Sequence, residues 1–306
     1  MLLSHVVVAV LAAFLIFSFR LWSHGRSASF VPGSSASTAT PAKPSLDNPQ
    51  HLQNVIREGI ILAGGAAAIL LQVAIPGVGK AIDSHSNFSY RPLDRLRTTM
   101  TFVYCMTFGT PQEKQIIVDM VHRAHAPVKG AGYSADEVHL QLWVAATLYA
   151  IHVRIYEDIF GPMDPVVAEA LYHEYAVFAV SLRVPAEMWP VDRRAFWTYW
   201  DQQIERLEVT PEARRVAQDL LYNARLPLLV KMPMPWVRLI AVEMLPPRIR
   251  EAYGFESTKL RAVAYCVAWE VTRVAYPLIP MYIRTYPMRY YLKDMRKRIE
   301  RRLDRR

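Results

Sequence analysis

The stretch from Pro111 to Ala126 reads PQEKQIIVDMVHRAHA and shows the pattern that most of the chain repeats. Its apolar side chains recur at three- and four-residue spacing, so Ile117, Val121 and His125 share one face of a helix. Pro127 follows directly and ends the helix. The stretch therefore predicts an amphipathic helix that carries the His125 imidazole toward the core at its last turn.

The same helical periodicity continues nearly throughout from Leu46 onward, interrupted by Pro and Gly, and no run alternates as a strand would. We expect an all-α domain over residues 46–306. Gly59 to Gly79 contains no charged residue and could be a membrane span. Its small residues and Pro76 favour a buried core helix. Leu226 to Pro247 contains several Pro residues and cannot form one continuous helix. That segment either packs irregularly on the core or lies on a membrane.

The N-terminus predicts a membrane anchor. Leu2 to Phe19 has no charged residue, and as a helix it would be about 27 Å long, close to the thickness of a bilayer core. Arg20 and Arg26 follow this run and no Lys or Arg precedes it, which places the body on the cytosolic side. The alternative is a cleaved signal peptide. We expect one transmembrane helix in residues 1–22 and a flexible spacer rich in Ser, Pro and Ala in residues 23–45.

Charge and motifs exclude several classes of protein. The formal net charge of the 306 residues is +9, but the segment from Arg289 to Arg306 carries most of it, so the excess is a basic tail and not a nucleic-acid-binding face. The two cysteines, Cys105 and Cys266, have no paired spacing and argue against a disulfide framework or a zinc cluster. The sequence contains no phosphate-binding, dinucleotide-binding, zincin or serine-hydrolase motif.

Asp94 to Met106 predicts a second helix of interest. Arg95 and Thr99 share a stripe with the apolar Phe102 and Met106, so a cation and a hydroxyl lie on an otherwise apolar face. A buried Arg needs an anionic partner. That partner could be a cofactor carboxylate or a protein carboxylate such as Glu58 or Glu157. On this pattern we expect Arg95 to be buried and Arg97, on the other side of the helix, to be exposed.

Residues alone leave the role of the histidines open. His122 lies three residues before His125 and shares part of its face. Two roles fit either position: a core histidine with one hydrogen-bond partner, or a ligand of a cofactor. The core histidine is the more common case.

Several linked runs together resemble one known family. They are REGIILAGGAAAILLQ (Arg57 to Gln72), RPLDRLRTTMTFVYCMTFGTP (Arg91 to Pro111), VHRAHAPVKG (Val121 to Gly130), EMWPVDRRAFWTYW (Glu187 to Trp200) and RTYPMRYYLKDMR (Arg284 to Arg296). In this order they resemble the catalytic domain of the MpaB and latex-clearing oxygenases, and the fungal branch most closely.

The resemblance implies an all-α domain that binds haem b and uses O₂ to cleave carbon-carbon double bonds of isoprenoid chains. We therefore expect a haem-dependent oxygenase that acts on a hydrophobic small molecule, such as a prenyl or polyketide chain, in fungal secondary metabolism. The resemblance also implies an anchor in the endoplasmic reticulum membrane with the catalytic domain in the cytosol, in agreement with the charge pattern.

The resemblance also implies site residues. Ala124 to Lys129 matches the segment that holds the proximal ligand in the bacterial branch, so His125 is expected to bind the haem iron. Arg95 to Thr99 matches the family's Arg-x-x-Lys-Thr motif, and Thr98 stands where that motif has Lys. Arg95, Thr98 and Thr99 are thus expected to bind the cofactor, and Arg95 and Thr99 to take part in catalysis.

Two departures from the family accompany this match. Ile75 and Ala145 stand where many relatives have His, and the family's distal glutamate has only Asp83 or His85 as stand-ins. We expect apolar walls from Phe102, Met106, Val121 and Trp143 to receive the substrate. A second function stays open: a membrane-associated helical protein that binds a lipid or a partner without catalysis.

Overall fold

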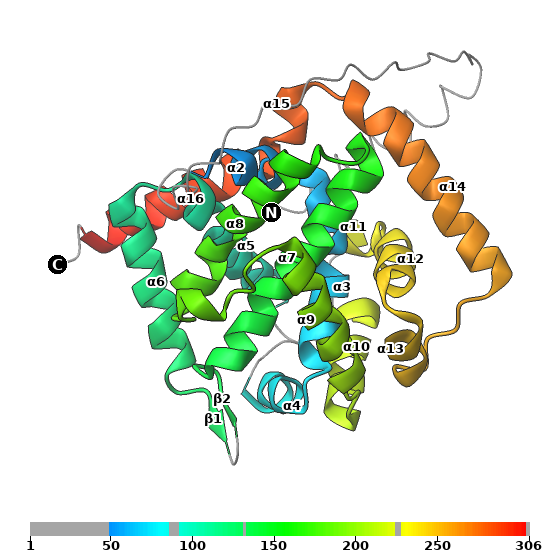
Figure 1. The fold of residues 1–306 in the computed structure, drawn as a ribbon, viewed down its shortest axis with the longest axis horizontal. Coiled ribbons are helices and arrows are strands. Elements are labelled where there is room, and N and C mark those ends of the chain that lie inside the picture. The colour runs from blue at the N-terminus through cyan, green and yellow to red at the C-terminus, as the bar shows by residue number, and fades with distance from the viewer. Residues whose placement is uncertain (1–48, 86–91, 131–132, 224–227, 304–306) are drawn as a thin grey trace.

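The computed structural model describes residues 49–85, 92–130, 133–223 and 228–303, which form an all-helical body with one small hairpin (Figure 1). In chain order the elements are α2 (Gln50–Ile56), η2 (Gly59–Gly64), α3 (Gly65–Val73), α4 (Pro76–His85), α5 (Pro92–Phe108), α6 (Pro111–His125), β1 (Lys129–Gly130), β2 (Tyr133–Ser134), α7 (Val138–Phe160), α8 (Pro165–Ser181), η3 (Ala186–Met188), α9 (Arg193–Arg206), α10 (Pro211–Tyr222), α11 (Leu228–Lys231), α12 (Met234–Met244), α13 (Pro247–Ala252), α14 (Lys259–Ala275), η4 (Tyr276–Leu278), α15 (Met281–Arg284) and α16 (Tyr286–Leu303). The expected all-α class is confirmed for the described residues. The expected anchor and spacer lie outside the described residues.

The long helix α7 is the centre of the body, and α2, α3, α8, η2 and α14 all pack against it. From Gln141 to Val153 nearly every side chain is buried, on all sides of the helix. A helical segment that is apolar all round is stable only inside a protein core. The other helices therefore form layers around α7.

An aromatic cluster fills one side of this core. The ring of Tyr149 on α7 lies 4.6 Å from that of Phe196 and 5.1 Å from those of Tyr172 and Tyr175, in edge-to-face arrangements. Such pairs add to the free energy gained from burying the rings. The cluster fixes α8 and α9 against α7.

Gly64 lets the segment from Gly59 to Val73 approach α7 closely. A Cβ atom at Gly64 would lie 2.3 Å from Cγ2 of Ile151 and 2.5 Å from Cδ1 of Ile155, so a larger residue cannot fit without movement. Most side chains of η2 and α3 are buried, as expected for a core segment. Among the described helices no single one is long and apolar enough to cross a bilayer, although α2 with Gly59–Val73 passes that test as a pair bent by 70°.

The segment rich in Pro is broken into short helices, as predicted. It forms α11 and α12, and α13 begins at its end. Ile240, Ala241, Val242 and Met244 of α12 are buried, whereas Leu228 of α11 is exposed. This arrangement agrees both with packing of the segment on the core and with contact between the segment and a membrane.

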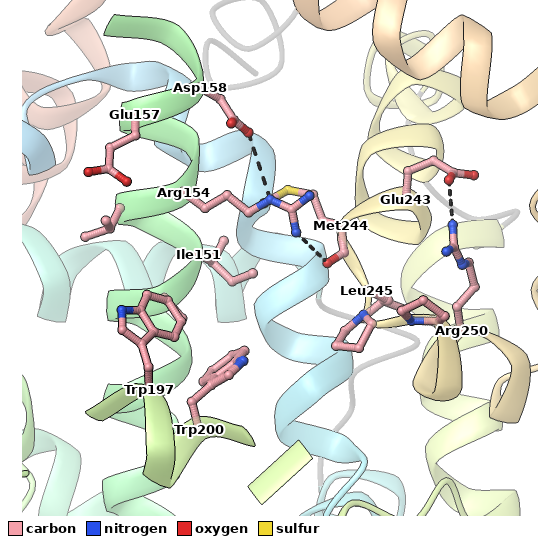
Figure 2. A pocket seen from close by; sticks show the side chains of 14 residues that line it. Ile151, Arg154, Glu157, Asp158, Trp197, Trp200, Glu243, Met244, Leu245 and Arg250 are labelled. Carbon is pink, nitrogen blue, oxygen red and sulfur yellow. Dashed lines mark hydrogen bonds and ion pairs between the residues drawn. The ribbon is translucent and has the colours of Figure 1, made fainter. Parts of the chain in front are cut away.

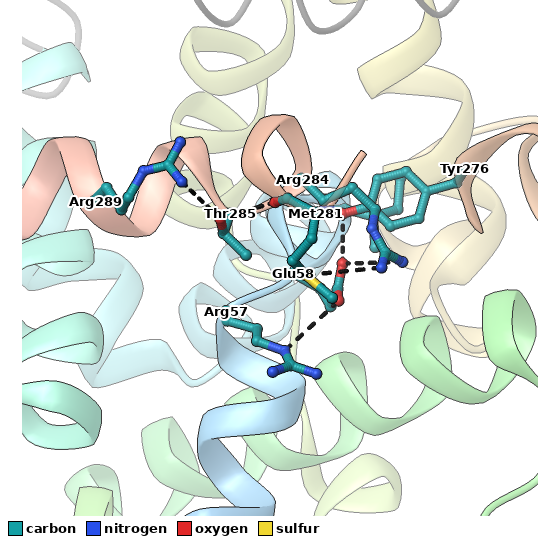
Figure 3. Close-up of polar contacts among 8 residues, drawn as sticks. Arg57, Glu58, Tyr276, Met281, Arg284, Thr285 and Arg289 are labelled. Carbon is teal, nitrogen blue, oxygen red and sulfur yellow. Dashed lines mark hydrogen bonds and ion pairs between the residues drawn. The ribbon is translucent and has the colours of Figure 1, made fainter. Parts of the chain in front are cut away.

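Glu58 joins the first helices to the end of the chain (Figure 3). Its carboxylate is 2 % exposed, accepts a hydrogen bond of 3.0 Å from the hydroxyl of Tyr276, and lies 3.6 Å from Nη1 of Arg284. Gly59 faces Arg284 at this point, and a Cβ there would meet the Arg284 carbonyl oxygen at 2.8 Å. The prediction that Glu58 could pair with Arg95 is wrong, because Arg284 holds that position.

Arg97 joins α5 to α16. Its Nε donates a 2.8 Å hydrogen bond to Asp294, and its Nη2 forms a second contact with the same carboxylate. This pairing raises the pKa of Arg97 through the hydrogen bond to Asp294 and lowers the pKa of Asp294. Arg95, in contrast, is exposed. The expectation of a buried Arg95 is therefore wrong, and Arg97 is half-buried in an ion pair instead of fully exposed.

We expect Arg97→Ala to lower the free energy of unfolding by about 1 kcal/mol, because a bidentate but partly exposed ion pair is lost. Arg95→Ala should cost less. Urea denaturation of both variants measures the difference, and a double-mutant cycle with Asp294→Asn isolates the pair. A larger loss in Arg95→Ala than in Arg97→Ala would contradict the structure.

Candidate functional site

His125 lies at the C-terminal end of α6, where the chain turns into the β1–β2 hairpin. The turn begins with the hydrogen bond from Val128 N–H to the His125 carbonyl, 2.8 Å. After the hairpin the chain enters α7, and the side chain of Gln141 in the first turn of α7 contacts the imidazole of His125. Nε2 of Gln141 lies 3.1 Å from Nδ1 of His125 and also contacts the carbonyl oxygen of Ala135. Two helices thus orient one half-buried ring.

Burial is the main electrostatic influence on His125. It lowers the pKa of the imidazole because a charged ring loses hydration. Asp136 acts in the opposite direction, and the positive charges of His122 and Arg95 lower the pKa further. The ring is therefore neutral at physiological pH. The influence of Arg95 also shows that the start of α5 lies within electrostatic reach of the end of α6.

The Arg95, Thr98 and Thr99 side chains are all exposed, close to the start of α5. The Thr98 hydroxyl donates to the Asp94 carbonyl, 2.9 Å, within its own helix. Phe102 and Met106, further along the expected stripe, are buried. The stripe therefore exists, but its polar half extends beyond the packed core. The structure brings Arg95 within electrostatic reach of His125.

His122 has surroundings different from those of His125. Its Nε2 is buried and has no hydrogen-bond partner among the described residues, and Arg183, after α8, acts on its pKa. Burial is the first cause of its lowered pKa. His122 lies one turn before His125 on the same helix and is therefore a matched control for His125.

His152 is the most deeply buried of the described histidines. It is 5 % exposed in the middle of α7, and its Nδ1 lies 3.3 Å from the hydroxyl of Tyr175. Burial lowers its pKa to about 4. Of the other histidines, His139 is exposed and His173 lies 3.5 Å from Glu169, while the side chains of the stand-ins Asp83 and His85 lie outside the described residues. His152 is therefore a neutral core residue.

A ligand-sized cavity lies elsewhere on α7. It has a volume of about 530 Å³ and opens between α7, α9, α12 and α13 (Figure 2). Trp197, Trp200 and Ile151 form apolar walls. Arg154 reaches across it, with Nη1 donating to the Met244 carbonyl at 3.3 Å and Nε 3.9 Å from Asp158. Gln141 and Arg154 are about 20 Å apart along the helix axis, so the cavity and His125 are separate regions.

The residues expected to form substrate walls do not line this cavity. Phe102, Met106, Val121 and Trp143 are buried in the core, and the indole N–H of Trp143 donates to the Leu71 carbonyl. The expectation that they form substrate walls stays a prediction. Trp197 and Trp200 line the cavity, and they belong to the run Glu187 to Trp200 quoted for the resemblance, which gave them no role. The signal available in the sequence was the aromatic-rich segment Ala195 to Trp200 in the first half of α9.

Gln141 also escaped the sequence analysis. It lies in an apolar run, and a buried amide there has no pattern that distinguishes it from a surface residue turned inward. Only the path of the hairpin brings it to His125. A similar limit applies to metal sites: the described residues contain no group of three or more His, Cys, Asp or Glu side chains that could hold a metal ion.

Comparison with protein families identifies residues 52–274 as an oxygenase catalytic domain. The chain belongs to the family described as "ER-bound oxygenase mpaB/B'/Rubber oxygenase, catalytic domain". The recognition made from sequence motifs is confirmed. The match ends at the last turn of α14, so the resemblance noted for Arg284 to Arg296 lies beyond it.

Two mycobacterial proteins are similar over most of their length. Uncharacterized proteins of Mycobacterium bovis and Mycobacterium tuberculosis are each 32 % identical to this chain over 247 residues, which is 76 % of this chain and 95 % of each relative. The expected membership of the fungal branch finds no support in them. No solved structure matches the chain.

We expect stability to depend on pH through His152. Its pKa is about 4 in the folded protein, below the ordinary 6.5, so the unfolded state binds more protons between these values. The contribution of His152 to the free energy of unfolding should be fully present above pH 6.5. It should be lost as the pH drops toward 4, by about 3 kcal/mol in total.

The matched variant is His152→Gln, which cannot titrate. Denaturation at several pH values should show a shallower slope between pH 6.5 and 4 for this variant than for the unchanged protein. Identical slopes would mean that His152 is protonated without cost in the fold.

Proposed function

We propose that this chain is a haem b-dependent oxygenase that acts on a hydrophobic small molecule, with His125 as the protein ligand of the iron. The observation that carries the proposal is the neutral imidazole at the end of α6, oriented by Gln141 and within electrostatic reach of Arg95. The proposed reaction is oxidative cleavage of a carbon-carbon double bond, or oxygenation, in a prenyl or polyketide chain. Membership of the oxygenase family supports this class of reaction.

The donor set suits haem better than a bare metal ion. A haem iron needs only one or two protein ligands, because the porphyrin supplies four. One oriented histidine therefore suffices, in a body whose described part has no cluster of three ligand side chains. The lowered pKa of His125 keeps the ring in the neutral form that binds metal.

The amide of Gln141 decides which nitrogen of His125 carries the proton. As placed, the amide nitrogen donates to Ala135 and faces Nδ1, so the ring proton belongs on Nε2. Ligation through Nε2 requires the proton on Nδ1, as in most metal-binding histidines. Once the amide is turned over, the oxygen of Gln141 accepts a hydrogen bond from that Nδ1–H. The side chain present can thus serve the ligand form, at the expense of the contact with Ala135.

When bound, the haem supplies the activation of O₂, and the chain supplies charge, hydrogen bonds and shielding. The Arg95 guanidinium provides the cation that a haem propionate requires. Thr98 and Thr99, one turn further along the same helix, offer hydroxyl groups on the exposed part of α5. Thr98 has no ammonium group to compete for the iron, unlike the Lys in the related motif.

The proposal includes attachment to the endoplasmic reticulum membrane by the apolar segment Leu2 to Phe19, with the catalytic body in the cytosol. The family description contains the words "ER-bound", which agrees with such an anchor. Residues Arg20 and Arg26 support the cytosolic orientation.

A second function has one observation in its favour. The cavity beside Trp197 and Trp200 begins about 14 Å along α7 from Gln141 of the His125 site, and it could bind a small amphiphile without any chemistry. A non-catalytic lipid-binding or partner-binding protein would use that cavity alone. Haem content separates the two functions.

We expect the purified full-length protein to show a Soret band with iron near one per chain, and His125→Ala to lose most of it, because the axial bond is the main specific contact with the iron. His122→Ala is the matched control and should keep its haem. The absorption spectrum and iron content are the measurements. Colourless, iron-free protein that still binds lipid would support the second function; undiminished haem in His125→Ala would move the ligand elsewhere.

We also expect Asn87, the acceptor of the sequon Asn87-Phe88-Ser89, to stay free of glycan in a eukaryotic host, since a cytosolic body never meets the lumenal enzyme. This residue lies outside the described residues. Endoglycosidase treatment tests the glycan, and protease added to sealed microsomes should digest the body. A glycan, or a body protected from protease, would place the domain in the lumen.

A further inference from the structure

The long helix α14 has a row of apolar side chains on its outer face. Figure 1 shows it at the edge of the body. The members of this row recur at three- and four-residue spacing, which aligns them along one side of a helix. They are exposed by 40–78 %: Leu260, Val263, Val267, Val271 and Val274. We call these five residues the α14 stripe.

The opposite face of α14 packs against the core. Thr272 and Ala275 are buried, Trp269 donates a 2.8 Å hydrogen bond to Asp158 of α7, and Tyr265 packs against the core. The stripe is therefore a second apolar face that the fold itself does not use. The charges at its edge, Glu270 and Arg273, lie 2.5 Å apart and neutralise each other. No charge lies within the stripe.

The exposed apolar surface continues beyond α14. Leu278 in η4 and Met281, Tyr282 and Ile283 around α15 are exposed by 41–71 %. Arg289 lies over the ring of Tyr282 at 3.7 Å and donates to its carbonyl oxygen. An aromatic ring with an Arg at the end of an aliphatic surface is the combination found where proteins meet the polar headgroups of a bilayer.

The start of the described body lies at the same end of α14. Pro49 precedes α2, a helix only about 10 Å long, and Glu58 directly after α2 contacts Tyr276 of η4 and Arg284 of α15 (Figure 3). Residues 20–48 connect this point to the apolar segment Leu2 to Phe19, and a flexible coil of that length has an end-to-end distance of roughly 30 Å. An anchored chain would hold the stripe within reach of the bilayer.

We propose that the α14 stripe and the exposed side chains of η4 and α15 form a lipid-docking face that lays the body on the membrane surface. The occupant is the headgroup and upper acyl region of a bilayer. Aliphatic side chains without aromatic or Arg anchors inside the stripe suit lipid better than a protein interface, whose centre is enriched in Trp, Tyr and Arg. This inference rests on the proposed anchor, and it adds an orientation of the body that an anchor alone does not define.

The test places a probe on the stripe of the full-length protein. Cys266, which is exposed on α14, is changed to Ser, and Cys105 stays because it is buried and its thiol pKa is raised to about 12 by burial. An environment-sensitive fluorophore is attached at Val267→Cys or Val274→Cys. Gln218→Cys on α10, which is also exposed, is the matched control. The protein is reconstituted in phosphatidylcholine vesicles with a minor share of phosphatidylserine.

Nitroxide-labelled lipid should quench the probes at both stripe positions several-fold, and aqueous iodide should have little effect on them. The control position should show the reverse. Vesicle flotation reports the anchor separately. If the protein floats while iodide quenches the stripe as strongly as the control, the anchor stands and the docking face is wrong. Stripe probes shielded from both quenchers would mean that protein covers the face, either a second copy or residues 2–19. Protein that fails to float would overturn both proposals.

Discussion

The packing of the first helices against the last ones depends on the contacts of the buried Glu58 carboxylate. An ionised carboxylate inside a protein is stable only when cations and hydrogen-bond donors replace its hydration. Here the Tyr276 hydroxyl and the Arg284 guanidinium do so, and both come from the far end of the chain. The Tyr276 hydroxyl oxygen also accepts from Ile60 N–H at 3.2 Å, so backbone and side chain meet at one point. The first and last helices are thereby fixed to each other around α7.

Local patterns determined much of the fold in advance. The capping box of Thr110 and Glu113, with Pro111 between them, starts α6 where the sequence predicts. The uncharged run after Gly59 is buried, and Gly64 accounts for its close approach to α7. These features depend on neighbours in the sequence or on composition. A single sequence contains both kinds of information.

The errors arise where partners are distant in the sequence. Periodicity assigns Arg95 and Phe102 to one face of a helix, but it does not say where that helix leaves the core. Arg97 was assigned to solvent because Asp294, nearly two hundred residues away, has no signature as its partner. Gln141 and the cavity beside Trp200 depend in the same way on how separate helices meet. The inward position of His125 at the end of α6 could be predicted, because its own helix defines the direction of the side chain.

The rigidity of α7 has a consequence for ligands. Its first turn holds the amide that orients His125, and its middle forms a wall of the cavity, so one unbroken helix fixes the spacing of the two regions. Ala150, the lining residue of α7 nearest to Gln141, lies about 14 Å from it along the helix axis, and side-chain motion cannot close that gap. A short molecule therefore contacts only one of the two regions at a time. An extended ligand has to be about as long as that interval to contact both, so α7 sets a minimum length for such a ligand.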